Sequence, residues 1–217
     1  MHVKICGITK PDQALAIAQL GADYLGYICV SSSPRFVTPE QVDLITNKFT
    51  NNVQNHKLGH VGVFLDVDIA EISKYINISN INTIQLHGDE SIEFCQQVKL
   101  KFPQIKLIKA FRIKNRKTLD HILPYTNHVD VVLLDAYDPQ LAGGTGKTID
   151  LSILKDFQPS CDWWLAGGLS PQNLEMAIAQ LQPDGIDVSS GVEISAGNKD
   201  VEQVRNLLKV VRRNLKN

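Results

Sequence analysis

A cysteine and an aspartate stand where they could exchange protons with a small molecule. Cys6 follows an apolar run that begins at His2, and Asp135 ends the run VVLLD. A thiol, with an ordinary pKa of about 8.5, needs a nearby positive charge to act as a base, and Lys4 lies on the same side of an extended strand. A carboxyl group that ends a buried run is partly desolvated, which favours its protonated form. The pair therefore predicts acid/base catalysis, with inert packing of Cys6 and a capping role for Asp135 as alternatives.

Two segments near the C-terminus have the composition of a phosphate site. Each follows a short apolar run, and each offers bare backbone N–H groups or hydroxyls, the groups that hold phosphate at the carboxyl ends of parallel strands. Taken singly, either segment would suit an ordinary tight turn. At adjacent strand ends they favour a phosphorylated small substrate. The candidate phosphate ligands are Gly167, Gly168, Ser189, Ser190 and Gly191.

Further polar residues stand near the expected strand ends. Arg35, in SPRF, could hold a carboxylate or phosphate through two parallel hydrogen bonds, or be an ordinary surface cation. His87 ends an apolar run without a second ligand at metal-binding spacing, so it is expected to line a pocket, and no metal site is expected. His2 and His60 stand near strand starts and are expected to be structural. The segment AGGTGKT at 142–148 lacks the first glycine of a Walker motif and suits either a loop that closes over a ligand or a solvated loop.

The composition bounds the class of protein. The chain has 217 residues, 22 Lys and Arg against 23 Asp and Glu, and a formal net charge of −1, which gives no basic footprint for nucleic acid. Its apolar runs are interrupted well short of the ~18 residues that a membrane span needs, and no signal peptide is evident. The four cysteines form no CxxC pair, so reduced thiols in the cytoplasm are expected. We expect one domain over residues 1–217.

Eight short β-rich runs recur along the chain, each followed by a polar stretch of helical spacing. They begin at His2, Tyr24, Val61, Thr83, Lys106, Asp130, Asp162 and Gly185. Eight units in 217 residues leave about 27 residues each, enough for a strand, a helix and two loops. The pattern predicts an α/β fold, a closed (β/α)8 TIM barrel whose active site lies at the carboxyl ends of its strands. An open doubly wound sheet is the alternative, disfavoured because no GxGxxG follows the first run.

Two helices are predicted from their capping residues, apolar spacing and terminal charges. Ser170 is placed to cap a helix that runs to Leu181. The last helix is predicted from an apolar stripe through Val201, Val204, Leu208 and Val211, with basic residues at its end.

Eight motifs, in order, resemble the phosphoribosylanthranilate isomerase family of tryptophan biosynthesis. They are KICGIT, GADYLGYICVSSSPRFVTPEQ, VGVFLD, QLHGDE, LLDA, GGTGKTID, AGGLSPQN and DVSSGVE. The resemblance covers nearly the whole chain. Departures from the family pattern are minor: TIDL from Thr148, Ala196-Gly197 after the phosphate segment, and Ile28-Cys29-Val30 in the second run. None of them removes a catalytic group.

The resemblance implies an Amadori rearrangement of N-(5-phosphoribosyl)anthranilate to 1-(2-carboxyphenylamino)-1-deoxyribulose 5-phosphate. It makes Cys6 the general base and Asp135 the general acid, with no cofactor. Arg35 would hold the carboxylate of the anthranilate ring. His87 would line the pocket, and Gly144 and its loop would close over the substrate. The phosphate ligands would be those given above.

Asp187 faces the same way as Ser189 by strand alternation, so it is expected to approach the substrate or pair with Lys4. We expect a phosphorylated aminosugar as the partner, with no nucleic acid or membrane, and a protein that acts as a monomer or homodimer.

Other functions remain open at this point. One is another phosphate-binding barrel isomerase, which would need a carboxylate where Cys6 stands. A metal-dependent epimerase is a second, and a barrel that binds a sugar phosphate without turnover is a third.

Overall fold

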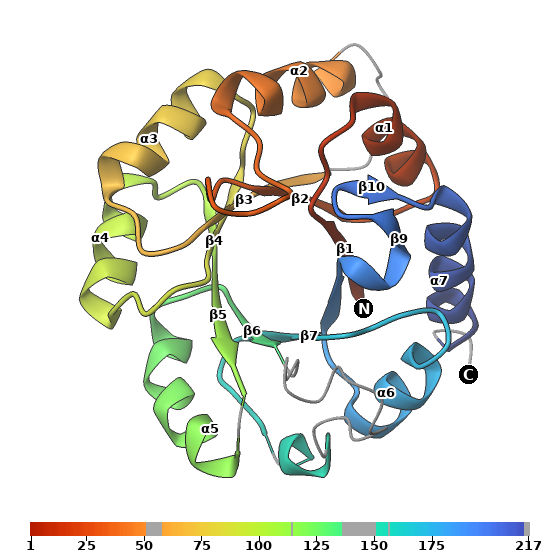
Figure 1. The fold of residues 1–217 in the computed structure, drawn as a ribbon. Helices are drawn as coiled ribbons and strands as arrows, with labels where there is room; N and C mark the ends of the chain where they lie inside the picture. Colours follow the sequence, from red (N-terminus) through yellow and green to blue (C-terminus); the bar gives the residue numbers. More distant parts are fainter. Residues whose placement is uncertain (51–57, 114, 136–150, 156, 215–217) are drawn as a thin grey trace.

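In the computed structural model, residues 1–50, 58–113, 115–135, 151–155 and 157–214 are described. Within them, eight parallel strands pair in chain order and close into a barrel. The strands are β1 (His2–Cys6), β2 (Tyr24–Ile28), β3 (Gly59–Phe64), β4 (Thr83–Leu86), β5 (Lys106–Arg112), β6 (Val131–Asp135), β7 (Asp162–Ala166) and β8 (Gly185–Val188). All eight predicted strands are confirmed, and Figure 1 shows them as a central ring viewed along the barrel axis. The closed (β/α)8 barrel is therefore confirmed over the open sheet.

Helices form an outer ring around the strands (Figure 1). They are α1 (Pro11–Gln19), α2 (Pro39–Thr50), α3 (Ile69–Ile78), α4 (Ile92–Lys101), α5 (Arg116–Ile122), α6 (Leu174–Leu181) and α7 (Val201–Asn214). Between β6 and β7, the described residues include a short 3₁₀ helix at Leu151–Leu154. None of the helices in the described residues is long and apolar enough to cross a membrane.

The helix termini differ in part from the prediction. α6 begins at Leu174, not directly after Ser170, because residues 171–173 form a turn. In that turn the Asn173 side chain accepts a hydrogen bond from the Ser170 backbone N–H and donates one to the Gly168 carbonyl. Three residues of the predicted α7 stripe, Val204, Leu208 and Val211, are buried, whereas Val201, at the first position of the helix, is only partly buried.

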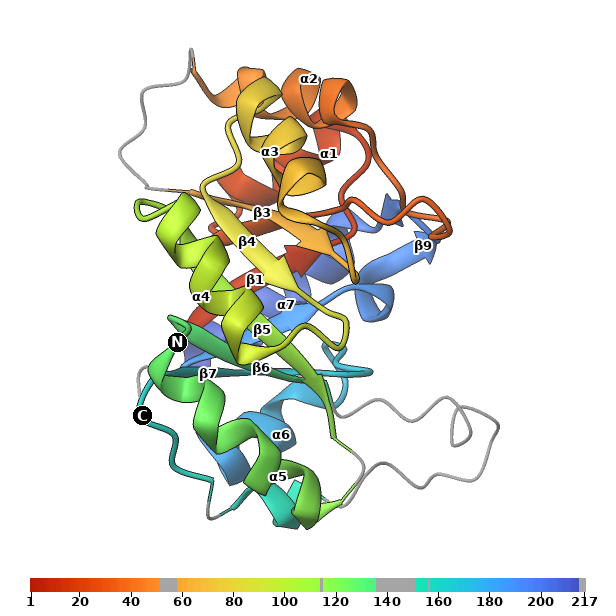
Figure 2. The same ribbon diagram turned by 90° about the vertical axis from the view of Figure 1, so that its left-hand side faces the viewer.

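A hairpin that the sequence analysis did not anticipate follows β8. It consists of β9 (Glu193–Ser195) and β10 (Asn198–Lys199), which pair antiparallel before α7 begins. Figure 2 shows β9 on the side of the molecule away from the chain's N-terminus. Since the N-terminus leads directly into β1, this is the side on which the parallel strands end. The hairpin therefore adds side chains to the barrel mouth.

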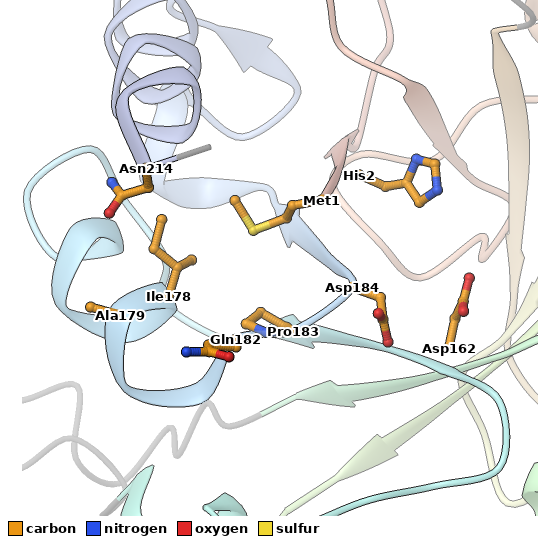
Figure 3. Close-up of a pocket in the computed structure, with 9 residues that line it drawn as sticks. All are labelled: Met1, His2, Asp162, Ile178, Ala179, Gln182, Pro183, Asp184 and Asn214. Atoms are coloured by element: carbon orange, nitrogen blue, oxygen red, sulfur yellow. The ribbon is translucent and has the colours of Figure 1, made fainter. Parts of the chain in front are cut away.

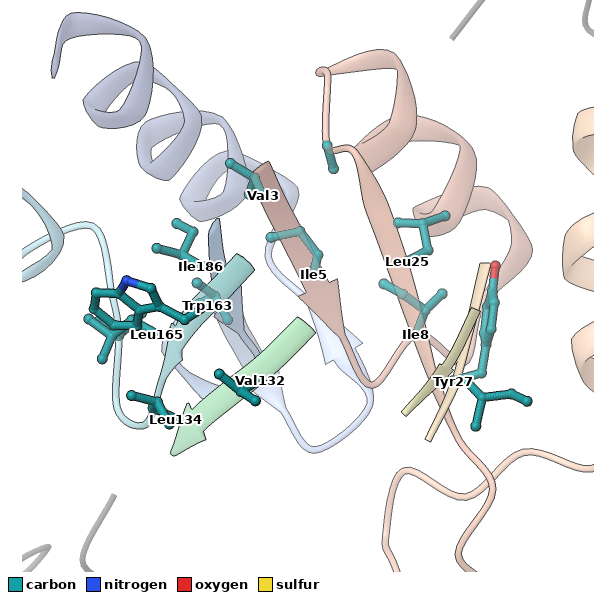
Figure 4. Close-up of a cluster of buried hydrophobic side chains, with 14 of the residues drawn as sticks. Val3, Ile5, Ile8, Leu25, Tyr27, Val132, Leu134, Trp163, Leu165 and Ile186 are labelled. Atoms are coloured by element: carbon teal, nitrogen blue, oxygen red, sulfur yellow. The ribbon is translucent and has the colours of Figure 1, made fainter. Parts of the chain in front are cut away.

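Strand alternation divides the apolar residues into two cores. The larger core lies between strands and helices and includes Ile5, Leu134 and Leu165 (Figure 4). The smaller core fills the barrel interior and includes Cys6 and Leu133. Because Asp135 is two residues beyond Leu133, it faces the same interior at the strand's carboxyl end.

Candidate active site

Cys6 lies inside the barrel beside an ion pair. The Lys4 ammonium nitrogen is 2.8 Å from Asp187 Oδ2, and Lys4 is fully buried. Lys4 and Asp187 face each other in the register that joins β1 to β8. Gly26 of β2 makes room for these side chains, because a Cβ there would lie 2.7 Å from Cys6 Sγ and 3.0 Å from Lys4 Cε. The structure thus places Lys4 beside Cys6, as expected from their positions on the same side of a strand.

Burial and charge oppose each other at the thiol. Burial raises the pKa of Cys6 above its ordinary value, and the positive charge of Lys4 offsets this only in part. Burial alone would lower the pKa of Lys4, but Asp187 and Cys6 raise it above its ordinary value. Lys4 therefore stays charged at neutral pH, and the Cys6 thiol rests in its protonated form.

His87 and Asp135 meet across the barrel mouth. His87 Nε2 lies 3.6 Å from Asp135 Oδ2, and both side chains are partly exposed. The Gln85 side-chain amide lies 3.1 Å from His87 Nδ1, the ring nitrogen that does not face Asp135, and this contact helps to fix the orientation of the ring. His87 thus lies close enough to interact with the Asp135 carboxyl group as that group gains or loses a proton.

Arg35 reaches the same mouth from the loop between β2 and α2. Its Nε and Nη2 donate hydrogen bonds of 2.6 to 3.2 Å to the Glu193 carboxylate on β9. The Arg35 side chain passes over Gly7, where a Cβ would lie only 2.6 Å from Arg35 Cδ. Gly7 also has a φ of +80°, which favours glycine, so the chain directly after Cys6 leaves space for Arg35.

Lys199 on β10 also contacts the Glu193 carboxylate. Its fully buried ammonium group lies 2.7 Å from Glu193 Oε1 and donates to the Ser189 carbonyl at 3.2 Å. The Ser189 hydroxyl in turn donates to the Cys6 carbonyl at 3.0 Å. The sequence analysis missed Glu193 and Lys199. The only available signal was two charged residues flanking a short segment after the Ser-Ser-Gly motif.

The predicted phosphate segments occupy adjacent strand ends. Gly167 and Gly168, after β7, have φ values of +98° and +64°, a conformation that glycine adopts without strain. Ser190 and Gly191 form a short 3₁₀ turn after β8. A Cβ on Gly191 would lie 1.9 Å from the Leu169 carbonyl oxygen, so the two segments approach through bare backbone. Gly144 lies outside the described residues, as does most of the loop around it.

The other features noted among the described residues do not suggest a second active site. No group of three or more His, Cys, Asp and Glu side chains in the described part of the chain could hold a metal ion. An open cavity lined by His2, Asp162 and Asp184 lies where β1, β7 and β8 begin (Figure 3), at the opposite end of the barrel. His60 is buried and hydrogen-bonded to the Tyr27 hydroxyl, in agreement with the predicted structural role.

The fold and the polar mouth define a (β/α)8-barrel protein with acidic, basic and thiol groups gathered where such barrels carry out chemistry. The family model described as N-(5'phosphoribosyl)anthranilate (PRA) isomerase matches residues 3–210. The chain belongs to the N-(5'-phosphoribosyl)anthranilate isomerase family. It is an aldose–ketose isomerase of tryptophan biosynthesis.

Individual relatives agree along almost the full length. N-(5'-phosphoribosyl)anthranilate isomerase from Acaryochloris marina is 52% identical over 212 residues, which cover 97% of this chain and 98% of the relative. A solved structure of phosphoribosyl anthranilate isomerase from Thermotoga maritima aligns with a TM-score of 0.85 at 33% identity, covering 98% of this chain and 99% of that one. A second structure, with a TM-score of 0.82 at 31% identity and the same coverage, holds reduced 1-(o-carboxyphenylamino)-1-deoxyribulose 5-phosphate.

Proposed function

We propose that this chain, as a single (β/α)8 domain, converts N-(5'-phosphoribosyl)anthranilate to 1-(2-carboxyphenylamino)-1-deoxyribulose 5-phosphate, with Asp135 as general acid and Cys6 as general base. The family assignment supports the reaction. The observation that supports the residue roles is that both groups face the barrel interior at the ends of β1 and β6. The reacting sugar would lie between them.

The first half of the reaction needs an acid. Asp135 protonates the furanose ring oxygen, and the bond from that oxygen to C1 breaks as the nitrogen lone pair forms a C=N bond. The product is an open-chain iminium ion and an Asp135 carboxylate. The nearby His87 ring can donate a hydrogen bond to that carboxylate as its negative charge forms.

The second half needs a base. The iminium group acidifies the proton on C2, and the Cys6 thiolate removes it to give an enolamine. The enolamine tautomerises to the ketone when C1 gains a proton and the C2 hydroxyl loses one. Because Cys6 rests as the thiol, it first releases a proton to solvent and then takes the C2 proton. Asp135 gives its proton to the ring oxygen and regains one from solvent, so both groups return to their resting states. The net change is a hydrogen shift within the substrate, and the step needs no cofactor.

Binding groups lie on both sides of this pair. Arg35 holds the carboxylate of the aromatic ring. Asp187 keeps Lys4 in place, and its Oδ1 atom, buried and without a hydrogen-bond partner among the described residues, can accept a hydroxyl of the sugar. Gly144 and its neighbours would cover the bound substrate. The phosphate ligands are Gly167, Gly168, Ser189, Ser190 and Gly191. The partner would be a phosphorylated aminosugar, and the enzyme would work in the cytoplasm as a monomer or homodimer.

Loss of substrate fluorescence on mixing freshly made phosphoribosylanthranilate with the protein tests this proposal. Cys6→Ser and Asp135→Asn should each lower kcat by about a hundredfold to ten-thousandfold, since a removed general acid or base contributes about 10² to 10⁴. The matched controls are Cys161→Ser and Asp120→Asn, which change the same residue types away from the mouth. Near-normal turnover in either site variant would refute the assigned roles, and no turnover in the wild type would refute the reaction.

A further inference from the structure

Glu193 contacts Arg35 along one edge of the guanidinium group only. The hydrogen bonds run from Nε to both carboxylate oxygens, at 3.0 and 3.2 Å, and from Nη2 to Oε2, at 2.6 Å. Among the described residues, no partner is recorded for Nη1. A guanidinium group can bind two planar anions at once, one on the Nε–Nη2 edge and one on the Nη1–Nη2 edge. Arg35 therefore keeps its second edge for another anion.

The charges around Glu193 leave an excess on Arg35. One carboxylate, 4% exposed, is shared by two cations, Lys199 and Arg35. Lys199 is fully buried, whereas the Arg35 side chain is 24% exposed. The uncompensated positive charge is therefore presented to a ligand by Arg35 and not by Lys199.

The same cluster is tied to the rest of the mouth. Lys199 donates to the carbonyl and, at 3.4 Å, to the hydroxyl of Ser189, in the predicted phosphate segment. The backbone N–H of Gly197 donates to Glu193 Oε1 at 3.1 Å. The β9–β10 hairpin thus connects the Arg35 guanidinium to the segment that begins at Ser189.

Glu193 is an anion throughout the working pH range. Its burial alone would raise its pKa, but the hydrogen bonds from Arg35 and Lys199 outweigh burial and lower the pKa to about 2. A neutral side chain at this position would leave Lys199 buried without its counter-charge and Arg35 free to rotate.

We propose that Glu193 is a positioning residue that sets specificity, because it turns Arg35 so that its Nη1–Nη2 edge meets a carboxylate on the aromatic ring of the substrate. The enzyme would then distinguish a carboxylated arylamino sugar phosphate from one without the carboxyl group. This inference rests on the proposed function, in which Arg35 binds that carboxylate. It adds a residue that acts on specificity through Arg35 without touching the ligand.

Calorimetric titration with two ligands tests the inference. One ligand is reduced 1-(2-carboxyphenylamino)-1-deoxyribulose 5-phosphate, and the other is the same compound without the carboxyl group. Glu193→Gln should raise the Kd of the carboxylated ligand about tenfold, equivalent to about 1.4 kcal/mol, and change the Kd of the other less than twofold. Glu193→Asp, which keeps the charge, should recover part of the loss. Glu202→Gln, which changes an exposed glutamate on α7, should leave both Kd values unchanged.

Three results would overturn the inference: an equal rise in both Kd values, no change in either, or tighter binding of the carboxylated ligand, which would mean that Glu193 competes with it. If Glu193→Gln does not fold, Glu193→Asp replaces it in the test. Glu193→Asp should then raise the Kd of the carboxylated ligand by less than about tenfold and leave the Kd of the other ligand unchanged, and the absence of this selective rise would overturn the inference.

Arg35→Met separates the two proposals. If Arg35→Met still prefers the carboxylated ligand, Arg35 is not the anchor and that part of the proposed function fails. If it loses the preference but Glu193→Gln does not, only the inference about Glu193 fails.

Discussion

Lys4 and Asp187 form a buried ion pair, 2.8 Å between Nζ and Oδ2, across the seam where the first and last strands close the barrel. The two charges act on the adjacent Cys6 thiol with opposite sign. Lys4 lowers the pKa of Cys6 and Asp187 raises it, although burial is the largest influence. These opposite effects allow an electrostatic role to be distinguished from a structural one. A structural defect would not shift the Cys6 pKa in one direction when Lys4 is replaced and in the other when Asp187 is replaced.

Substitutions in this pair should move the Cys6 pKa in opposite directions. Lys4→Gln removes the cation and leaves the Asp187 carboxylate beside the thiol, so the pKa should rise. Asp187→Asn leaves Lys4 as the nearer charge, so the pKa should fall. The measurement is the pH dependence of thiolate absorbance, taken as the difference from Cys6→Ser, together with the pH profile of kcat/KM. Because the thiolate is the base, kcat/KM should rise with pH through the Cys6 pKa, and this rise should shift with it.

Other charges near Cys6 provide the control for this experiment. Lys199 on β10 lowers the pKa of Cys6 as well, and Arg35 interacts with the thiol from the loop after β2. Lys199→Met should therefore raise the pKa less than Lys4→Gln does, since Lys199 is the weaker influence. Shifts of the same sign in Lys4→Gln and Asp187→Asn would contradict the electrostatic interpretation.

A methyl group at Gly26 should damage turnover more than binding. The added Cβ would lie 2.7 Å from Cys6 Sγ, closer than real contacts allow, so the thiol must move. A displacement of about 1 Å at a reacting group can cost about a hundredfold in rate. We expect Gly26→Ala to lower kcat by tenfold to a hundredfold, on the order suggested by that dependence, with little change in the Kd of the reduced product analogue.

Gly62→Ala is the matched control for crowding. Its Cβ would contact Phe64 and Ile81, which belong to the outer core and not to the barrel mouth. This variant should lose thermal stability while keeping kcat. An equal fall of kcat in both variants would show that the effect at Gly26 comes from general disruption of the barrel.

The barrel itself could be predicted from sequence because its signal is local. Each strand is a short apolar run with alternating sides, and the eight strands began at or within two residues of the predicted positions. The β9–β10 hairpin gave no such signal. β9 has three residues and β10 has two, too short for a periodic pattern to be recognised.

The partners of the predicted site residues were harder to foresee. Arg35 and Glu193 are 158 positions apart in the chain, and nothing in either local sequence indicates the other. The pairing of Lys4 with Asp187 was considered because strand alternation places both in the barrel interior. Sequence could supply the cation beside Cys6, but not the degree of burial, which outweighs that cation and raises the pKa of the thiol.

Gly191 should be intolerant of any side chain if the two strand ends hold phosphate together. A Cβ there would collide with the Leu169 carbonyl, so Gly191→Ala must push the segments after β7 and β8 apart. We expect the Kd of ribose 5-phosphate to rise at least about tenfold, since several N–H donors would lose their alignment and each charge-assisted bond is worth about 1.5 to 3 kcal/mol. Gly21→Ala, a strained position with φ +97° after α1, should reduce stability but keep that Kd. Unchanged affinity in Gly191→Ala would place the phosphate elsewhere.

His60 should make the protein sensitive to mild acid. The side chain is 6% exposed, its Nδ1 lies 2.8 Å from the Tyr27 hydroxyl, and burial lowers its pKa from 6.5 to about 4. Because the folded protein binds this proton less readily than the unfolded chain, the stability is fully present above pH 6.5 and is lost as pH falls toward 4. The loss should be on the order of 3 kcal/mol, at 1.36 kcal/mol for each pH unit. Urea unfolding at pH 7.5 and pH 4.5 measures it. His60→Gln, which cannot gain a proton, should be less stable at pH 7.5 but should show a smaller decrease between the two pH values; an equal decrease in both proteins would assign the acid sensitivity to other groups.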